Sequence, residues 1–151
     1  MILFLTALAV LLIDQGSKIA VRSFLAPKEY IVLLNIKIIH FANPGSALGI
    51  LPYYRYAYIA LTLMIIAIII VYSLRYKPNK KMNLACGLFL GAAVGNLADR
   101  VFYGRITDFV SAGKAVFNVA DIAIVIGILI VLWNVYQSVD SKSGNNLKSI
   151  K

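Results

Sequence analysis

Four long apolar segments, separated by short stretches of polar and charged residues, set the pattern of this chain. A helix needs about 20 apolar residues to cross the hydrocarbon of a bilayer. The segments approach or exceed this length, and we expect each to be a transmembrane helix; they cover residues 2–24, 56–74, 84–98 and 117–139. Small residues crowd the third segment, which allows neighbouring helices to approach closely. The first segment lacks the basic start of a secretory signal peptide, so we expect a retained helix.

Residues 26–52 follow a different pattern. From Tyr30 to Phe41 branched and aromatic residues dominate, and the sequence Asn43-Pro44-Gly45 follows as a turn. Such runs, bounded by turn residues, are typical of strands. The run is too short to span a bilayer. We therefore expect a strand or hairpin outside the hydrocarbon, packed on the membrane surface.

The predicted fold class is an all-α membrane protein with four transmembrane helices and a small β-rich platform. Residues 1–139 are expected to form one domain, with the platform at 26–52. The end of the chain, residues 140–151, is polar and contains a Gly-Asn-Asn sequence. Polar segments of this kind bury too little apolar surface to fold, so we expect a disordered tail.

Composition and charge support the membrane assignment. The 151 residues have a mean hydropathy of +0.84 and a formal net charge of +9. We do not expect a nucleic-acid partner, because the basic residues lie between apolar runs, where cationic flanks are ordinary in membrane proteins. The short loop after the second segment carries four of them, Arg75, Lys77, Lys80 and Lys81. Short-loop charge favours the cytoplasmic side, so both termini are expected to be cytoplasmic.

Four spans would gather nearly every unusual polar residue on one side of the bilayer. The end of the first span, the start of the second, the end of the third and the start of the fourth share a face. Asp14 and Lys18, spaced i and i+4, can pair there, and a structural ion pair is one explanation of both. Asp99 and Arg100 could serve as an interfacial anchor. The polar residues that meet at this face are Asp14, Lys18, Asn43, Asn96, Asp99, Arg100, Asp108, Asn118 and Asp121.

Two of these carboxylates, Asp108 and Asp121, have the features of a catalytic pair. Asn118 and Asp121 could also cap the fourth helix, although capping does not explain Asp108. The chain has a single cysteine, Cys86, and a single histidine, His40. An internal disulfide and a cysteine-based metal site are therefore excluded, a lone histidine is more often structural than catalytic, and we expect no metal. Two carboxylates held close together share a proton, so one can activate water while the other protonates a carbonyl oxygen. That chemistry is peptide hydrolysis without a covalent intermediate.

Five ordered motifs resemble those of bacterial lipoprotein signal peptidase, the membrane aspartyl peptidase also called signal peptidase II. The resemblance covers the chain from about Asp14 to Ile130. The motifs are Asp14-Gln15-Gly16-Ser17-Lys18, Asn43-Pro44-Gly45-Ser46-Ala47, the run from Gly91 to Arg100 with its Gly95-Asn96-Leu97-Ala98-Asp99-Arg100 end, Ile106-Thr107-Asp108-Phe109, and Phe117-Asn118-Val119-Ala120-Asp121.

The resemblance implies a fold, a reaction and a set of site residues. It implies an extracytoplasmic β-rich platform and an active site at the outer face of the bacterial inner membrane. It implies that Asp108 and Asp121 are the catalytic dyad. The substrate would be a prolipoprotein carrying diacylglycerol on a cysteine, cut just before that cysteine, and no cofactor is implied. Substrate binding is implied for Asn43, Gly45, Asn96 and Arg100, and shaping of the site for Asp14, Lys18, Asp99 and Asn118. We also expect membrane lipid as a partner and a monomer.

The sequence departs from the family pattern at a few points. Leu48 stands where an aromatic residue is frequent, Thr107 stands where valine or isoleucine is frequent, and the segment from Asp108 to Asp121 is short. Two other functions compete with the peptidase. A small proton-coupled multidrug transporter would use Asp14 in the first helix, and a structural membrane subunit would use its polar residues only to hold helices together.

Overall fold

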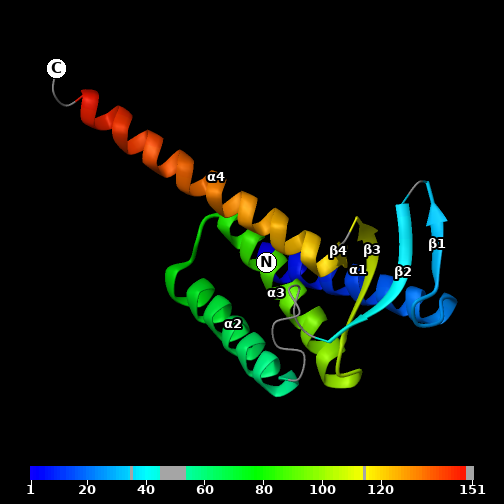
Figure 1. Cartoon of the computed structure of the whole chain (residues 1–151). Helices are drawn as coiled ribbons and strands as arrows, with labels where there is room; N and C mark the ends of the chain where they lie inside the picture. The colour runs from blue at the N-terminus through cyan, green and yellow to red at the C-terminus, as the bar shows by residue number, and fades with distance from the viewer. Residues whose placement is uncertain (35, 45–53, 114, 149–151) are drawn as a thin grey trace.

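Four helices account for most of the chain in the computed structural model, which describes residues 1–34, 36–44, 54–113 and 115–148, the last nine by backbone only. They are α1 (Ile2–Phe24), α2 (Arg55–Tyr76), α3 (Lys80–Phe102) and α4 (Val119–Lys148). All four are long and apolar enough to cross a membrane, the crossing part of α4 being Val119–Val139. The prediction of four transmembrane helices is therefore confirmed. Figure 1 shows the four helices beside a small sheet, with the end of α4 far from that sheet.

Helix boundaries differ from the prediction most at α3 and α4. α3 begins at Lys80, four residues earlier than expected. The side chain of Asn79 caps this helix by accepting a hydrogen bond from the Met82 N–H over 2.9 Å, so the polar residues expected to form a loop belong to the cap and first turn of α3. α4 continues to Lys148, so helix replaces the disorder expected for residues 140–148. The last three residues of the expected tail lie outside the described residues.

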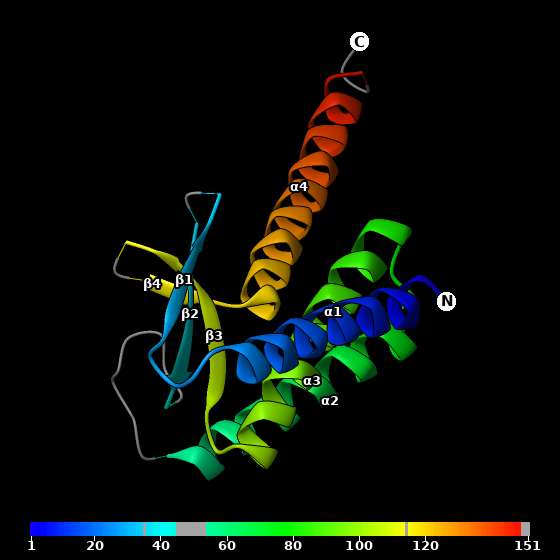
Figure 2. The ribbon, with the colours of Figure 1, turned by 90° about the vertical axis from the view of Figure 1, so that its right-hand side faces the viewer.

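The sheet is larger than predicted. It has four antiparallel strands in the order β1 (Tyr30–Leu33), β2 (Ile36–Asn43), β3 (Ile106–Ala112) and β4 (Ala115–Phe117). Only β1 and β2 come from the expected platform at 26–52. β3 and β4 come from the segment between α3 and α4, so the expected loop position of Asp108 was wrong, and the residue lies inside a strand. Figure 2 shows the sheet beside the end of α1 and the start of α4.

Strand register brings the platform to the segment that carries Asp108. Phe41 lies opposite Asp108 and Asn43 lies opposite Ile106. Asn43 is therefore a diagonal neighbour of Asp108 on the same face of the sheet, within reach of its side chain. Three buried residues, Val21, Leu25 and Phe109, fix the sheet against the end of α1.

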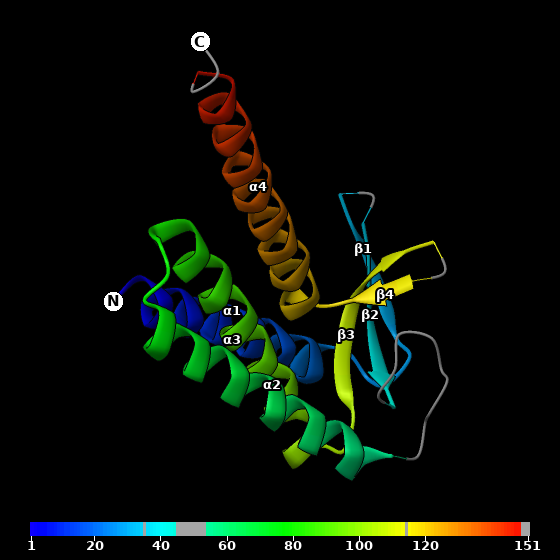
Figure 3. The same ribbon diagram turned by 90° about the vertical axis from the view of Figure 1, so that its left-hand side faces the viewer.

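Glycines at four-residue spacing let α1 and α3 pack backbone against backbone. A methyl group added at Gly91 would lie 2.5 Å from the carbonyl oxygen of Ala7 and 2.8 Å from Cβ of Val10. Gly87 faces the carbonyl of Leu3 in the same way, and Gly95 faces the carboxylate of Asp14. The close packing predicted from the small residues of the third span is confirmed. Figure 3 shows α1 and α3 lying side by side, as these contacts require.

Gly91→Ala should destabilise the protein, because the added Cβ overlaps a backbone atom that cannot move without shifting α1. Overpacking of this kind costs about 1–3 kcal/mol. The measurement is the thermal unfolding midpoint in detergent. Gly16→Ala is the matched control, since a Cβ at that helical glycine meets nothing within 4 Å. Equal midpoints for the two variants would contradict the close contact between α1 and α3.

Candidate active site

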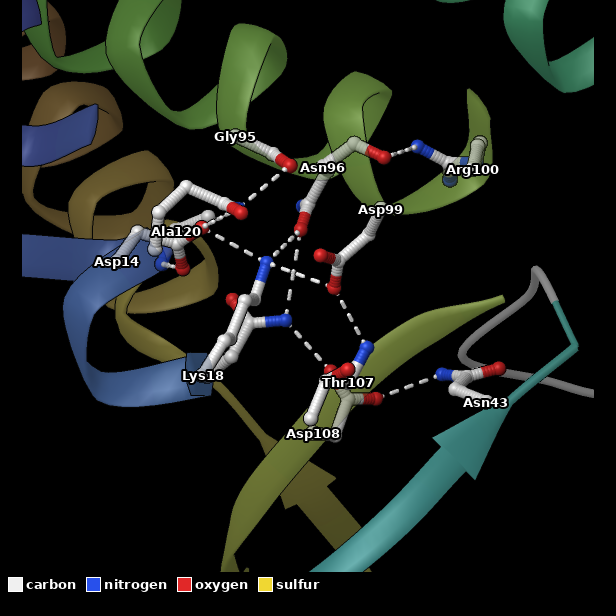
Figure 4. A network of polar contacts seen from close by, with 12 residues as sticks. Asp14, Lys18, Asn43, Gly95, Asn96, Asp99, Arg100, Thr107, Asp108 and Ala120 are labelled. Carbon is white, nitrogen blue, oxygen red and sulfur yellow. Dashed lines mark hydrogen bonds and ion pairs between the residues drawn. The ribbon is translucent and has the colours of Figure 1, made fainter. Parts of the chain in front are cut away.

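Four elements meet where α4 begins: the middle of α1, the last turns of α3, strand β3 and the first turn of α4. Figure 4 shows the polar side chains that converge there. Asp14, Lys18, Asp99, Asp108 and Asn118 are the largest fully buried side chains in the described part of the chain. Buried charged groups are costly unless each is paired or hydrogen-bonded. We therefore expect each of these five side chains to have a polar partner.

The start of α4 is held by a reciprocal cap between Asn118 and Asp121. The Asp121 N–H donates to Asn118 Oδ1 over 3.0 Å, and the Asn118 N–H donates to Asp121 Oδ2 over 3.1 Å. This is the capping-box arrangement, in which two N-terminal amides are satisfied by each other's side chains. The capping interpretation therefore applies to both residues, and it fixes the direction in which the Asp121 carboxylate points.

A third amide of this helix start is held from another helix. Asp14 Oδ1 accepts a hydrogen bond from the Ala120 N–H over 3.0 Å. A carboxylate is well placed at a helix N-terminus, where unpaired N–H groups and the helix dipole both favour negative charge. Asp14 thus joins the middle of α1 to the beginning of α4.

Lys18 neutralises Asp14 and links it to α3. Its ammonium lies 2.8 Å from Asp14 Oδ2 and 3.4 Å from Asp99 Oδ2, and it donates to Asn96 Oδ1 over 2.9 Å. The three donors of a lysine are therefore all occupied. The predicted i, i+4 pair of Asp14 and Lys18 is confirmed, and it is completely buried.

Asp99 connects this ionic cluster to the strand that carries Asp108. Its Oδ2 accepts the Thr107 N–H over 2.8 Å, and its Oδ1 lies 3.2 Å from an Arg22 nitrogen. Arg22 also donates to the Thr107 hydroxyl over 2.8 Å. Asp99 is fully buried and is not the interfacial anchor that was considered for it.

Arg22 was missed as a site residue in the sequence analysis. The signal was available, because residues 14, 18 and 22 recur at four-residue spacing and share one face of a helix. The hydroxyl of Thr107, which stands where the family often has an aliphatic residue, is used by this arginine.

Asp108 is 2% exposed and accepts a hydrogen bond at each carboxylate oxygen. The Asn43 amide donates to Oδ2 over 2.8 Å, and the Asn118 amide donates to Oδ1 over 2.5 Å. Burial raises the pKa of Asp108 from its ordinary value of 3.8 to about 6; the two amides lower the pKa and the carboxylate of Asp121 raises it. Asp108 can therefore gain or lose a proton close to neutral pH.

Asn118 is the direct link between the two candidate catalytic carboxylates. Its side-chain amide nitrogen bonds Asp108, while its side-chain oxygen bonds the backbone of Asp121. One residue therefore sets the position of both acids. The two acids also influence each other electrostatically, since the charge of Asp121 raises the pKa of Asp108.

The four predicted substrate-binding residues differ in their surroundings. Asn96 is almost fully buried, and its side-chain oxygen is occupied by Lys18. Arg100 lies at the end of α3, 5.4 Å from the centre of the Tyr58 ring, and its Nε is buried without a hydrogen-bond partner among the described residues. Asn43 contacts Asp108, as described above. Gly45 lies outside the described residues, as does Leu48.

A second arginine missed by the sequence analysis holds the end of α3. Arg55 donates from Nε to the carbonyl of Arg100 over 2.8 Å and from a terminal nitrogen to the carbonyl of Val101 over 2.6 Å. Cations near a helix C-terminus satisfy its unpaired carbonyls. No local pattern indicates this contact, since Arg55 and Arg100 are far apart in the chain.

Comparisons with known proteins agree with this architecture. A solved structure described as "Bacterial membrane enzyme structure by the in meso method at 2.3 A resolution" superposes with a TM-score of 0.87 at 24% identity, over 93% of this chain and 90% of that one. At this identity the likeness concerns the fold alone.

Similarity to sequence relatives identifies the family as well as the fold. This chain is 36% identical to the "Lipoprotein signal peptidase" of Pelotomaculum thermopropionicum, over 98% of this chain and all of the relative. It is 38% identical to the protein of the same name from Moorella thermoacetica, over 85% of this chain and 89% of the relative. The sequence profile of the family described as "Signal peptidase (SPase) II" matches residues 6–137. The chain therefore belongs to the signal peptidase II family, as its motifs predicted.

Proposed function

We propose that this protein is an aspartyl endopeptidase that removes the signal peptide from prolipoproteins, cutting before a cysteine that carries diacylglycerol. The protein is a multi-pass membrane protein of a family of signal peptidases, and its relatives are named lipoprotein signal peptidases. The observation that carries the aspartyl mechanism is the pair of carboxylates of Asp108 and Asp121, both held by Asn118: its side-chain nitrogen donates to the first, and its backbone N–H donates to the second.

The hydrogen bonds of the two acids suggest how they divide the work. Both oxygens of Asp108 accept from amides, which favours its ionised form. Asp121 uses Oδ2 to accept from the Asn118 N–H, and Oδ1 has no partner among the described residues. We assign the ionised role at the start of the reaction to Asp108, and the shared proton to the free oxygen of Asp121.

The reaction then proceeds in two steps, each with a pair of proton transfers. Asp108 takes a proton from a water molecule as the water oxygen bonds to the scissile carbonyl carbon, and Asp121 gives its proton to the carbonyl oxygen. When the tetrahedral intermediate collapses, the carbon–nitrogen bond breaks, the proton held by Asp108 passes to the departing amine of the cysteine, and one hydroxyl of the intermediate returns its proton to Asp121 as the new carboxyl group forms. General acid–base catalysis of this kind contributes about 10²–10⁴-fold to the rate.

The position of the pair suits a substrate anchored in lipid. A diacylated cysteine stays in the bilayer, so the enzyme meets it by lateral diffusion, and the peptide bond lies near the membrane surface. Asp121 stands at the start of a membrane-spanning helix, at that boundary. The exposed faces of the spans are apolar, with side chains such as Ile65, Ile68 and Leu129, and can contact acyl chains. Holding the reacting groups in place in this way offsets several kcal/mol of the barrier.

The buried network speaks against the multidrug-transporter alternative. That function needs Asp14 to exchange protons and bind a cationic drug. In the structure Asp14 is fully buried, paired with Lys18 and bonded to the start of α4. The family assignment gives the transporter no support.

The topology of the proposal follows from the charges and the substrate. The loop between α2 and α3, with its dense positive charge, would be cytoplasmic, together with both termini. The sheet and the two acids then lie at the outer face. A single copy supplies both carboxylates, so we propose that the monomer is active.

Asp108→Asn and Asp121→Asn should each lower the rate of cleavage of a diacylglyceryl-modified prolipoprotein by about 10³-fold, because each removes one proton carrier. The assay uses purified protein in detergent, with thermal unfolding measured beside it. Glu29→Gln is the matched control, since it makes the same carboxylate-to-amide change at an exposed residue just before β1 and should leave the rate unchanged. A folded Asp108 or Asp121 variant with parental activity would disprove the dyad.

The pH profile tests the assigned role of Asp108. Its pKa of about 6 predicts that kcat/KM falls about tenfold per unit as the pH drops below 6, because the base is then protonated. Asn43→Ala removes a donor that stabilises the ionised carboxylate, so the pKa should rise and the acid limb should move to higher pH.

Asn134→Ala is the control for this profile. It removes a half-buried asparagine of α4 that bonds Asn79, far along the helix from Asp121, and the acid limb should stay in place. If Asn43→Ala left the acid limb of the pH profile in place, or moved it to lower pH, the assignment of Asp108 as the base would be contradicted.

A further inference from the structure

The hairpin of β1 and β2 presents an apolar surface that the described part of the protein does not cover. All four side chains of β1 are exposed, although they are Tyr, Ile, Val and Leu. The turn residue Leu34 is 89% exposed and Ile36 is 49% exposed. We name these residues at the end of the hairpin the apolar tip: Ile31, Val32, Leu33, Leu34 and Ile36.

The register shows that one face of the tip is entirely apolar and that the other face is mixed. Ile31 and Leu33 pair with Ile38 and Ile36 on one face of the hairpin. Val32, opposite Lys37, lies on the other face. A strand that packs one face on a protein core and turns the other to water alternates apolar and polar residues. Strand β1 lacks this alternation, because Ile31, Val32 and Leu33 follow one another, so β1 presents apolar side chains on both of its faces.

The outer edge of β1 is also uncovered among the described residues. β1 is an edge strand that pairs only with β2 among the described strands. Exposed apolar edge strands promote aggregation in water unless something covers them. Figures 1 and 2 show the tip projecting free of the four helices.

Charge indicates which environment the tip enters. Lys37 is the only charged residue from Tyr30 to Ile39, and its ammonium lies 4.0 Å from the centre of the Tyr30 ring. A cation and an aromatic ring beside an apolar end match the boundary of a bilayer, where aromatic rings lie at headgroup level and lysine meets phosphate. The hairpin is also anchored to a membrane helix, because Ile38 of β2 packs on the cluster of Val21, Leu25 and Phe109.

We propose that the apolar tip inserts among the acyl chains of the bilayer that the four helices span, with Lys37 among the headgroup phosphates. The expected platform would then be held partly inside the outer lipid layer instead of resting on its surface. The tip adds an anchor at the end of the sheet whose strand β3 carries Asp108. A second copy paired along β1 is the competing occupant, and the test below separates the two.

The experiment places a fluorescent reporter at the tip of the full chain in lipid nanodiscs. Leu33→Trp is made in a Trp133→Phe background, which removes the only other tryptophan. Nanodiscs are made with ordinary phosphatidylcholine or with phosphatidylcholine brominated in the acyl chains. The proposal predicts a blue-shifted emission that brominated lipid quenches strongly. Ile31→Trp, on the same face, replaces the first variant if that one does not fold.

Ala26→Trp is the control at the opposite end of the hairpin, where the residue is exposed and precedes β1. Its emission should stay at longer wavelength and be quenched much less. In discs containing phosphatidylglycerol, quenching of the tip reporter should increase, and Lys37→Gln should abolish that increase.

Two outcomes would overturn the proposal. A tip reporter that emits at long wavelength and ignores brominated lipid would mean that the tip stands in water. A blue-shifted reporter that brominated lipid does not quench, in discs that hold two copies, would mean that a second chain covers the tip.

Discussion

The buried bond between the Asp14 carboxylate and the first turn of α4 is the contact on which the candidate site depends. It joins the middle of one membrane helix to the start of another over 3.0 Å. A carboxylate without a partner would be very costly at this depth. The adjacent ammonium of Lys18 removes that cost, and its remaining donors tie the pair to Asn96 and Asp99 of α3. The ionic cluster is therefore a structural joint between three helices.

The two catalytic candidates are both fixed by this joint, from opposite sides. On one side, the start of α4 presents Asn118 and Asp121 in a reciprocal cap. On the other side, Asp99 holds the backbone of Thr107, the residue before Asp108 in β3. The Asn118 amide then closes the gap by bonding Asp108. Residues far apart in the sequence are thereby held close together, and their side chains have little freedom to move.

The sequence predicted what depends on local pattern. The four spans follow from apolar length, the pairing of Asp14 with Lys18 follows from helical spacing, and the close packing of α1 on α3 follows from glycines. The strand that contains Asp108 was not predicted, because residues 106–112 become a strand through pairing with β2, a partner far away in the chain. Arg55 was missed for the same reason, whereas Arg22 could have been found from its spacing with Lys18. Family motifs identified the two acids, and the physical link between them, through Asn118, became visible only in three dimensions.

Lys18→Met tests the central claim most directly, because it keeps the size of the side chain and removes the charge that pairs with the buried carboxylate of Asp14. Breaking a buried ion pair by removing one partner costs about 3–5 kcal/mol. Thermal unfolding in detergent and prolipoprotein cleavage would be measured together, with Lys81→Met, at an exposed lysine that bonds Gln137, as the control. We expect Lys18→Met to lose most of its stability and its cleavage activity while Lys81→Met keeps both. A Lys18→Met protein that unfolds at the parental temperature and cleaves at the parental rate would contradict the account.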